Sequence, residues 1–197
     1  MKRLRLAILI SGRGSNMEQL LKACQDDAYP AQPVVVISNR ADASGLSTAR
    51  GFNVRAVAIP HKNYESRESF ENEIDRVLCQ TGVDIIALAG FMRVLTPGFV
   101  SRWAGRMINI HPSLLPKYPG LDTHRRAIEA GDKEAGCSVH WVTEGVDEGD
   151  VIAQSRVPVK AGDTAGSLSE RVLLEEHALY PKALAKACEL VRKKPSS

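Results

Sequence analysis

The segment Leu4-Arg-Leu-Ala-Ile-Leu-Ile-Ser-Gly-Arg-Gly-Ser-Asn16 joins an apolar run directly to a glycine-rich turn. Residues 4–10 are almost continuously apolar, as in a strand that is covered on both faces within a parallel sheet. After the turn, apolar side chains recur at helical spacing over residues 17–25. This order of strand, tight turn and helix predicts the opening of a βαβ unit.

The same order repeats through the first half of the chain. Further apolar runs predict strands at residues 34–38, 54–59, 83–89 and 107–111. Helical patterns are found at residues 44–50, 66–79, 99–103 and 123–130. The run at 83–89 is the most apolar of the strands, so we expect it at the centre of the sheet.

The last third of the chain has a different pattern. Residues 138–142 and 151–157 alternate polar and apolar side chains on either side of an acidic loop, which predicts antiparallel strands. A long helix is expected over residues 167–191, with Pro181 as a kink or break.

These elements predict an α/β fold with right-handed crossovers. We expect a single-domain Rossmann-like open twisted sheet, mostly parallel, with antiparallel strands in the C-terminal third and helices on both faces. The domain is expected to span residues 1–190, and residues 191–197 to form a basic and polar tail.

Composition excludes several classes of protein. A chain of 197 residues can bury one core without disulfides or metal, and a net charge of +3 with scattered basic residues argues against a nucleic-acid partner. No apolar run approaches the ~18 to 20 residues of a membrane span. The four widely spaced cysteines indicate reduced thiols in a cytoplasmic protein, and no metal-ligand spacing is recognisable.

The glycine-rich turn at residues 11–16 has two interpretations. Backbone N–H groups at the start of a helix attract a phosphate, which favours an anion site. The turn matches neither the dinucleotide fingerprint nor the P-loop, and it is equally consistent with a tight connection capped by Ser15 or Asn16.

A second polar feature interrupts the predicted strand at residues 107–111. Asn109 and His111 lie two residues apart and therefore share one face of the sheet. An amide and an imidazole placed together can stabilise an oxyanion and carry a proton, although a histidine that caps a strand end is the plainer alternative. Several acids could be the partner of His111, and the sequence alone does not choose among them. They are Asp132, Glu144, Asp147, Glu148 and Asp150.

Three motifs in order resemble the glycinamide ribonucleotide formyltransferase family. They are Ile10-Ser-Gly-Arg-Gly-Ser-Asn16, Ala89-Gly-Phe-Met-Arg-Val-Leu95 and Asn109-Ile-His-Pro-Ser-Leu-Leu-Pro-Lys-Tyr-Pro-Gly120. Ser138-Val-His-Trp-Val-Thr143, Asp147 and Glu175-Glu-His177 extend the resemblance to nearly the whole chain. The resemblance implies transfer of a formyl group from 10-formyltetrahydrofolate, the co-substrate, to the amine of 5-phosphoribosyl-glycinamide in purine synthesis.

The resemblance also implies site residues. Asn109, His111 and Asp147 match the catalytic trio, in which Asp147 raises the pKa of His111 and supports proton relay. The ribonucleotide is expected at Gly14, Ser15, Asn16 and Glu176. The folate pocket is expected at Arg67, Met92, Arg93, Val94, Leu95 and Asn109. A cis bond before Pro116, small-molecule substrates and a monomer or homodimer are further implications.

The chain departs from the family pattern in two places. Arg13 stands where asparagine is common, and Glu148 and Asp150 add acids near Asp147. Methionyl-tRNA formyltransferases share part of these motifs but carry an added C-terminal domain, so the length of this chain disfavours that alternative. A formyltetrahydrofolate deformylase and a non-catalytic folate or nucleotide binder on the same scaffold remain the alternatives.

Overall fold

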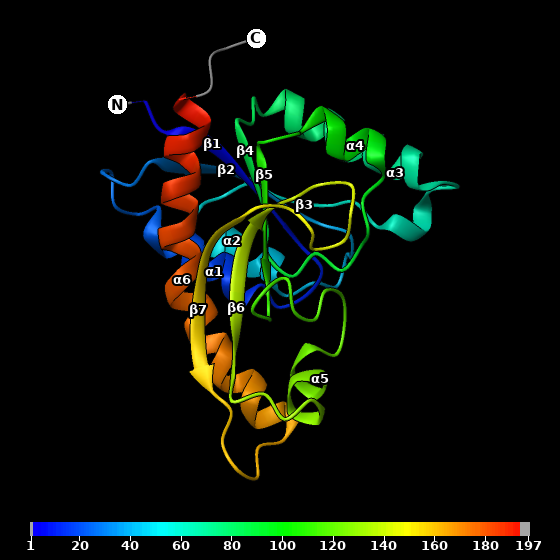
Figure 1. Ribbon diagram of the computed structural model, residues 1–197. Helices are drawn as coiled ribbons and strands as arrows, with labels where there is room; N and C mark the ends of the chain where they lie inside the picture. Colours follow the sequence, from blue (N-terminus) through cyan, green and yellow to red (C-terminus); the bar gives the residue numbers. More distant parts are fainter. Residues whose placement is uncertain (1, 194–197) are drawn as a thin grey trace.

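The computed structural model describes residues 2–193, and within this range seven strands form one sheet in the order β3-β2-β1-β4-β5-β6-β7 (Figure 1). The strands are β1 Leu4–Ile10, β2 Ala31–Ser38, β3 Ala56–Ala58, β4 Ile85–Leu88, β5 Met107–His111, β6 Glu134–Trp141 and β7 Val151–Pro158. Strands β1 to β5 are parallel, whereas β6 runs antiparallel to β5 and β7 antiparallel to β6. The predicted fold is confirmed, and β4 lies at the centre.

Helices cover both faces of the sheet (Figure 1). The helices are α1 Ser15–Ala23, α2 Gly45–Gly51, α3 Arg67–Gln80, α4 Pro97–Arg102, α5 Thr123–Glu129 and α6 Ala165–Lys193, with a 3-10 turn, η1, at His61–Asn63. Alternate residues of β1 divide the core: Ile8 packs with α1, α2 and α6, whereas Leu9 packs with α3 and α4. Because both faces of β1 are buried, its sequence is apolar without alternation.

Several elements differ from the sequence-based predictions, among them α6, β6 and β3. Helix α6 runs through Pro181 without a break, and the hydroxyl of Tyr29 donates to the Pro181 carbonyl at 2.6 Å. Strand β6 begins at Glu134, four residues before the predicted start, because its first half is held by pairing with β7. Strand β3 covers only Ala56–Ala58 of the predicted strand.

The end of α6 bears on the expected tail. Residues 191–193 belong to the helix, and Arg192 Nη2 donates to the Lys2 carbonyl at 2.7 Å. The rest of the expected tail, residues 194–197, lies outside the described residues. Across residues 2–193, no helix combines the length and apolarity needed to cross a membrane.

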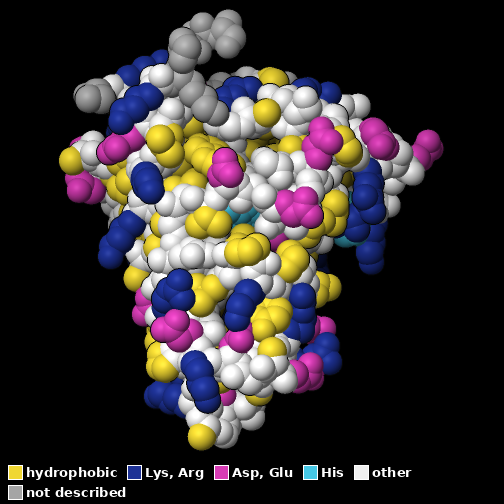
Figure 2. Space-filling view, viewed as in Figure 1, with side chains coloured by type: hydrophobic (Ala, Val, Ile, Leu, Met, Phe, Trp, Pro, Cys, Tyr) yellow, Lys and Arg dark blue, Asp and Glu magenta, His cyan; other side chains and the backbone are white. Residues whose placement is uncertain are grey.

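Acidic and basic side chains are interspersed on the face of the molecule shown in Figure 2. This distribution agrees with the small net charge of +3.

Candidate active site

Asn109 and His111 lie on one face of β5, as the strand period predicts. Ile108 and Ile110 point to the opposite face, into the core that α1 and α6 cover. Strand β6 lies beside β5 in the sheet, where Asn109 pairs with His140 and His111 pairs with Ser138.

The loop between β6 and β7 brings Asp147 to these side chains. One carboxylate oxygen, Oδ2, lies 3.1 Å from His111 Nδ1 and accepts the Gly120 N–H at 2.9 Å. The other, Oδ1, lies 3.3 Å from Asn109 Nδ2 and 3.3 Å from His140 Nε2. Among the acids that the sequence left open, Asp147 is therefore the one placed against His111.

The backbone of Asp147 has a φ of 57°, in the left-handed region where aspartate and asparagine are more readily tolerated than other non-glycine residues. Its side chain is 11% exposed. The neighbouring Glu148 and Asp150, which depart from the family pattern, are both exposed. Their charges face solvent, whereas that of Asp147 faces the site.

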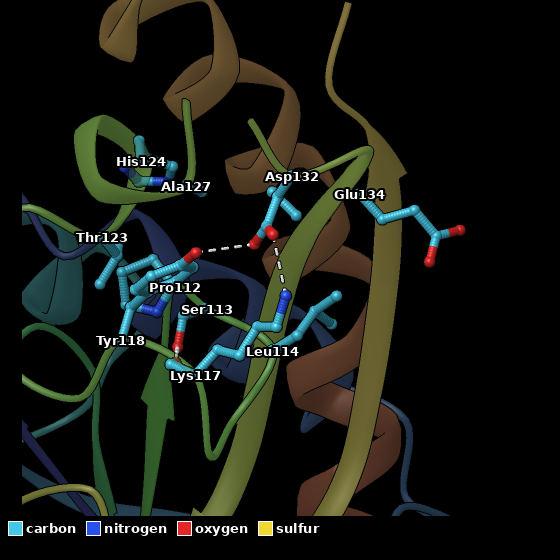
Figure 3. A pocket seen from close by; sticks show the side chains of 11 residues that line it. Pro112, Ser113, Leu114, Lys117, Tyr118, Thr123, His124, Ala127, Asp132 and Glu134 are labelled. Atoms are coloured by element: carbon cyan, nitrogen blue, oxygen red, sulfur yellow. Dashed lines mark hydrogen bonds and ion pairs between the residues drawn. The ribbon is translucent and has the colours of Figure 1, made fainter. Parts of the chain in front are cut away.

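The second ring nitrogen of His111 is held by the proline-rich loop. His111 Nε2 lies 2.9 Å from the carbonyl oxygen of Tyr118. The Tyr118 hydroxyl donates to Asp132 at 2.8 Å, and Lys117 Nζ contacts the same carboxylate at 2.9 Å (Figure 3). Asp132 therefore positions the loop that holds His111 rather than contacting His111 itself.

Ser138, directly opposite His111 on β6, anchors the same loop. Its hydroxyl donates to the Ser113 carbonyl at 2.6 Å and accepts the Leu115 N–H at 3.0 Å. The Leu115–Pro116 peptide bond is cis, as the family resemblance implies. Ser138 thus fixes the start of the proline-rich loop, and the contact of the Tyr118 carbonyl with His111 fixes the loop further along.

Both nitrogens of the His111 ring face oxygen acceptors, an arrangement that the imidazolium satisfies. Burial nevertheless lowers the pKa of His111 from its ordinary value, outweighing the Tyr118 carbonyl and the charge of Asp147, which both act to raise it. Asp147 acts in the expected direction, but the net shift is downward because the side chain of His111 is only 6% exposed.

The carboxyl of Asp147 remains ionised for a different reason. Burial acts to raise its pKa, yet the hydrogen bonds from His140 and the Gly120 N–H and the charge of His111 hold the pKa below its ordinary value. The result is a nearly buried carboxylate surrounded by donors from three segments of the chain.

The glycine-rich turn lines a cavity of about 460 Å³ at the carboxyl ends of the parallel strands. The lining residues are 11–16, Asn39, Arg40, His61, Ala89, Gly90, Met92 and Arg93. Asn109 does not line this cavity, but it pairs with Leu88 on β4, and the lining residues Ala89 and Gly90 directly follow Leu88. Ligands of open α/β sheets bind at this edge.

Gly14, and not Ser15 or Asn16, is the N-cap of α1. Its φ is 71°, a conformation that glycine adopts without strain, and its place in the cap leaves the first N–H groups of α1 without a capping side chain. The predicted side-chain cap by Ser15 or Asn16 is therefore wrong, since both residues lie inside the helix.

Asn16 contacts the residue predicted to bind the ribose. Its Nδ2 donates to Glu176 Oε2 at 2.6 Å, and both side chains are more than nine-tenths buried. The Asn16 Oδ1 atom is buried without a hydrogen-bond partner among the described residues. Burial raises the pKa of Glu176, while the Asn16 amide acts to lower it. A buried acceptor and a carboxylate thus meet beside the cavity.

The predicted folate residues are not gathered as one group. Met92 and Arg93 line the cavity, and Leu95 is buried in the core beneath α3 and α4. Val94 is 55% exposed. Arg67 is exposed in the first turn of α3 and does not line the cavity.

The sequence reasoning missed three residues of the site. His140 shares Asp147 with His111 and lies 3.2 Å from Asn109 Nδ2. Its signal was its place two residues after Ser138 on an alternating strand. Asn39 and His61 line the cavity, and each follows the end of a parallel strand, which is where ligand contacts are expected.

Comparison with known proteins gives a consistent result. A family model described as formyl transferase matches residues 4–184. A phosphoribosylglycinamide formyltransferase of Escherichia coli (strain K12) is 46% identical over 180 residues, which cover 91% of this chain and 85% of that protein. The crystal structure of phosphoribosylglycinamide formyltransferase from Brucella melitensis is 47% identical with a TM-score of 0.91, and the match covers 100% of both chains.

Longer relatives match as well. The trifunctional purine biosynthetic protein adenosine-3 of Drosophila melanogaster is 49% identical over 186 residues, which cover 93% of this chain. The chain spans only 13 to 18% of the length of the trifunctional relatives. The chain therefore belongs to the formyl transferase family and, within it, to the phosphoribosylglycinamide formyltransferases.

Proposed function

We propose that this protein transfers the formyl group of 10-formyltetrahydrofolate to the amine of 5-phosphoribosyl-glycinamide, a step of purine biosynthesis. The observation that carries the proposal is the meeting of Asn109, His111 and Asp147 at the end of β5, next to strand β4, whose following residues line the cavity. The relatives of similar length bear this activity in their names.

In this mechanism the amine nitrogen attacks the formyl carbon, and the carbonyl oxygen becomes an oxyanion. The Asn109 amide carries two hydrogens, so it can donate one to the oxyanion in place of its contact with His140 Nε2, while the other stays directed at Asp147. Protonated His111 places positive charge beside the same oxygen, and Asp147 stabilises that charge. Donors that are fixed before the reaction need no reorganisation when the oxyanion forms.

The tetrahedral intermediate then breaks the bond between the formyl carbon and N10 of the folate. The proton lost by the attacking amine reaches N10, so the step is balanced without a metal ion or a covalent enzyme intermediate. His111 supports this relay because burial lowers its pKa and eases proton release. Holding both substrates in one orientation supplies a further part of the rate.

The cavity supports the placement of the ribonucleotide. Gly14 and Ser15 present backbone N–H groups and the positive end of α1 to a phosphate. The unpartnered Asn16 Oδ1 and the Glu176 carboxylate are acceptors for ribose hydroxyls. Met92 and Arg93 form the part of the cavity wall that we assign to the folate. Arg67, Val94, Leu95 and Asn109 stay predicted folate residues, although they do not line this cavity.

We place the protein in the cytoplasm, where its four unpaired cysteines stay reduced, and we expect small molecules as its ligands and a monomer or homodimer as its form.

The test is formyl transfer from 10-formyltetrahydrofolate, or a stable analogue, to glycinamide ribonucleotide. Asn109→Ala and His111→Ala are each expected to lower kcat by about 10²-fold or more while the protein stays folded. Near-normal turnover in either variant contradicts the assigned roles. Formate release without the acceptor identifies a deformylase, and folate binding without turnover identifies a non-catalytic binder.

A further inference from the structure

Ser11, the first residue after β1, connects two loops of the cavity. Its backbone N–H donates to the Gly90 carbonyl at 3.1 Å, and its hydroxyl oxygen accepts the Met92 N–H at 2.8 Å. The residue is 7% exposed. One end of the glycine-rich turn is therefore joined at two points to the segment that carries Met92 and Arg93.

The two contacts hold a specific turn. Gly90 has a φ of 76°, and Phe91 is 9% exposed in the core that α3 and α4 cover. Ser11 bonds the residue before Phe91 and the residue after it, so it closes a bridge across this turn. The direction in which the chain leaves the turn toward residue 95 depends on that bridge.

Asn39, at the end of β2, fixes the direction of the Ser11 hydroxyl. The hydroxyl donates to Asn39 Oδ1 at 2.5 Å, and Asn39 is 3% exposed. With its hydrogen directed at Asn39, the Ser11 oxygen presents a lone pair to the Met92 N–H. The Asn39 amide is itself oriented, because its Nδ2 lies 3.2 Å from His61 Nδ1. A buried hydrogen-bond chain thus crosses the carboxyl edge of the sheet.

We propose that Ser11 is a positioning residue that couples the ribonucleotide loop to the folate segment. The inference rests on the proposed function, which assigns residues 14–16 to the ribonucleotide and residues 92–95 to the folate. Although Ser11 begins the ribonucleotide loop, its side chain holds the backbone of the folate wall. Loss of its hydroxyl therefore weakens folate binding even when no ribonucleotide is present.

The experiment compares the wild-type protein with Ser11→Ala and with a control, Thr81→Val. Thr81, the C-cap residue of α3, is also buried, and its hydroxyl donates to the Val77 carbonyl in the last turn of that helix at 2.8 Å, away from the cavity. The dissociation constant of a stable analogue of 10-formyltetrahydrofolate is measured by calorimetry without ribonucleotide. Melting temperatures of all three proteins are recorded in parallel.

We expect Ser11→Ala to raise the dissociation constant of the folate analogue about five- to tenfold, because the Met92 N–H loses its acceptor. Thr81→Val is expected to leave that constant unchanged, even where it lowers the melting temperature. Asn39→Ala, which leaves the bond between Met92 and Ser11 in place, is expected to raise the constant by about twofold.

An unchanged folate affinity in Ser11→Ala overturns the inference while leaving the proposed function intact. An equal loss in Thr81→Val also overturns it, since the loss would then reflect stability alone. A wild-type protein that binds no folate analogue overturns the proposed function and this inference together.

Discussion

Asp147→Asn removes one negative charge from the site and retains the shape of the side chain. Asparagine also tolerates the φ of 57° at this position, so the loop is expected to keep its path. The change leaves the Gly120 N–H an oxygen acceptor but deprives His111 and His140 of a charged partner. The variant therefore tests the charge and not the fold.

The size of the effect follows from the contacts. A hydrogen bond to a charged group contributes about 1.5–3 kcal/mol, and the bond between Asp147 and His111 is the one that bears on the oxyanion. Loss of that contribution in the transition state lowers kcat by about 10- to 150-fold. The side chains of both residues are nearly buried, so solvent screening reduces this value little.

The pH profile provides the second measurement. Protonated His111 is the active form, so the rate falls as the pH rises through its pKa. The charge of Asp147 acts to raise that pKa, so Asp147→Asn is expected to move the fall in rate to lower pH. Steady-state kcat is measured from about pH 4.5 to 8.5 at saturating substrates, a range chosen to contain about two units on either side of the ordinary histidine pKa.

Glu148→Gln is the matched control, because Glu148 is the next residue in the chain and its side chain is exposed. The substitution removes the same charge without changing the contacts of His111. We expect it to keep both kcat and the pH profile of the wild-type protein. A wild-type kcat in Asp147→Asn, an unchanged pH profile, or an equal loss in Glu148→Gln refutes the role assigned to the Asp147 charge.

Three further outcomes are expected. Ser15→Ala should raise the KM for the ribonucleotide about tenfold and change that for the folate less, as steady-state kinetics with each substrate varied will show; equal effects exclude the phosphate assignment. Glu176→Gln should raise the melting temperature at pH 8 and not at pH 4, because a carboxyl whose pKa is raised by burial destabilises the fold as the pH rises through that pKa; a constant difference contradicts the linkage. Asp132→Asn should lower the midpoint of unfolding in urea, since Tyr118 and Lys117 lose a charged partner; an unchanged midpoint contradicts the role of Asp132 in holding the loop.

The local pattern of the chain was sufficient for the elements and for one half of the site. Side chains alternate across a strand, so the spacing of Asn109 and His111 placed them on one face before any partner was known. Because side chains alternate, an apolar run without alternation indicates a strand that is buried on both faces, and this identified β1 and β4. The resemblance to the family assigned Asp147 and Glu176 to the predicted site, whereas spacing alone did not distinguish them from other acids.

Some element boundaries depended on contacts between distant residues. Strand β6 starts at Glu134 because its first residues pair with β7. Residues 134–137 do not alternate polar and apolar side chains, so the sequence did not predict that pairing. Helix α6 continues through Pro181 although proline supplies no N–H, because the helix is packed against the sheet on both sides of that residue. Local propensity is overridden in both places by tertiary packing.

What the tertiary structure alone decided is which polar groups meet. The register of β5 on β6 sets His140 opposite Asn109, and a loop 38 residues further along the chain sets Asp147 against both. The link from Ser11 to Met92 joins residues 81 positions apart. Sequence period fixes the direction in which a side chain points along its own strand, but distances between strands arise only when the sheet closes and its loops pack.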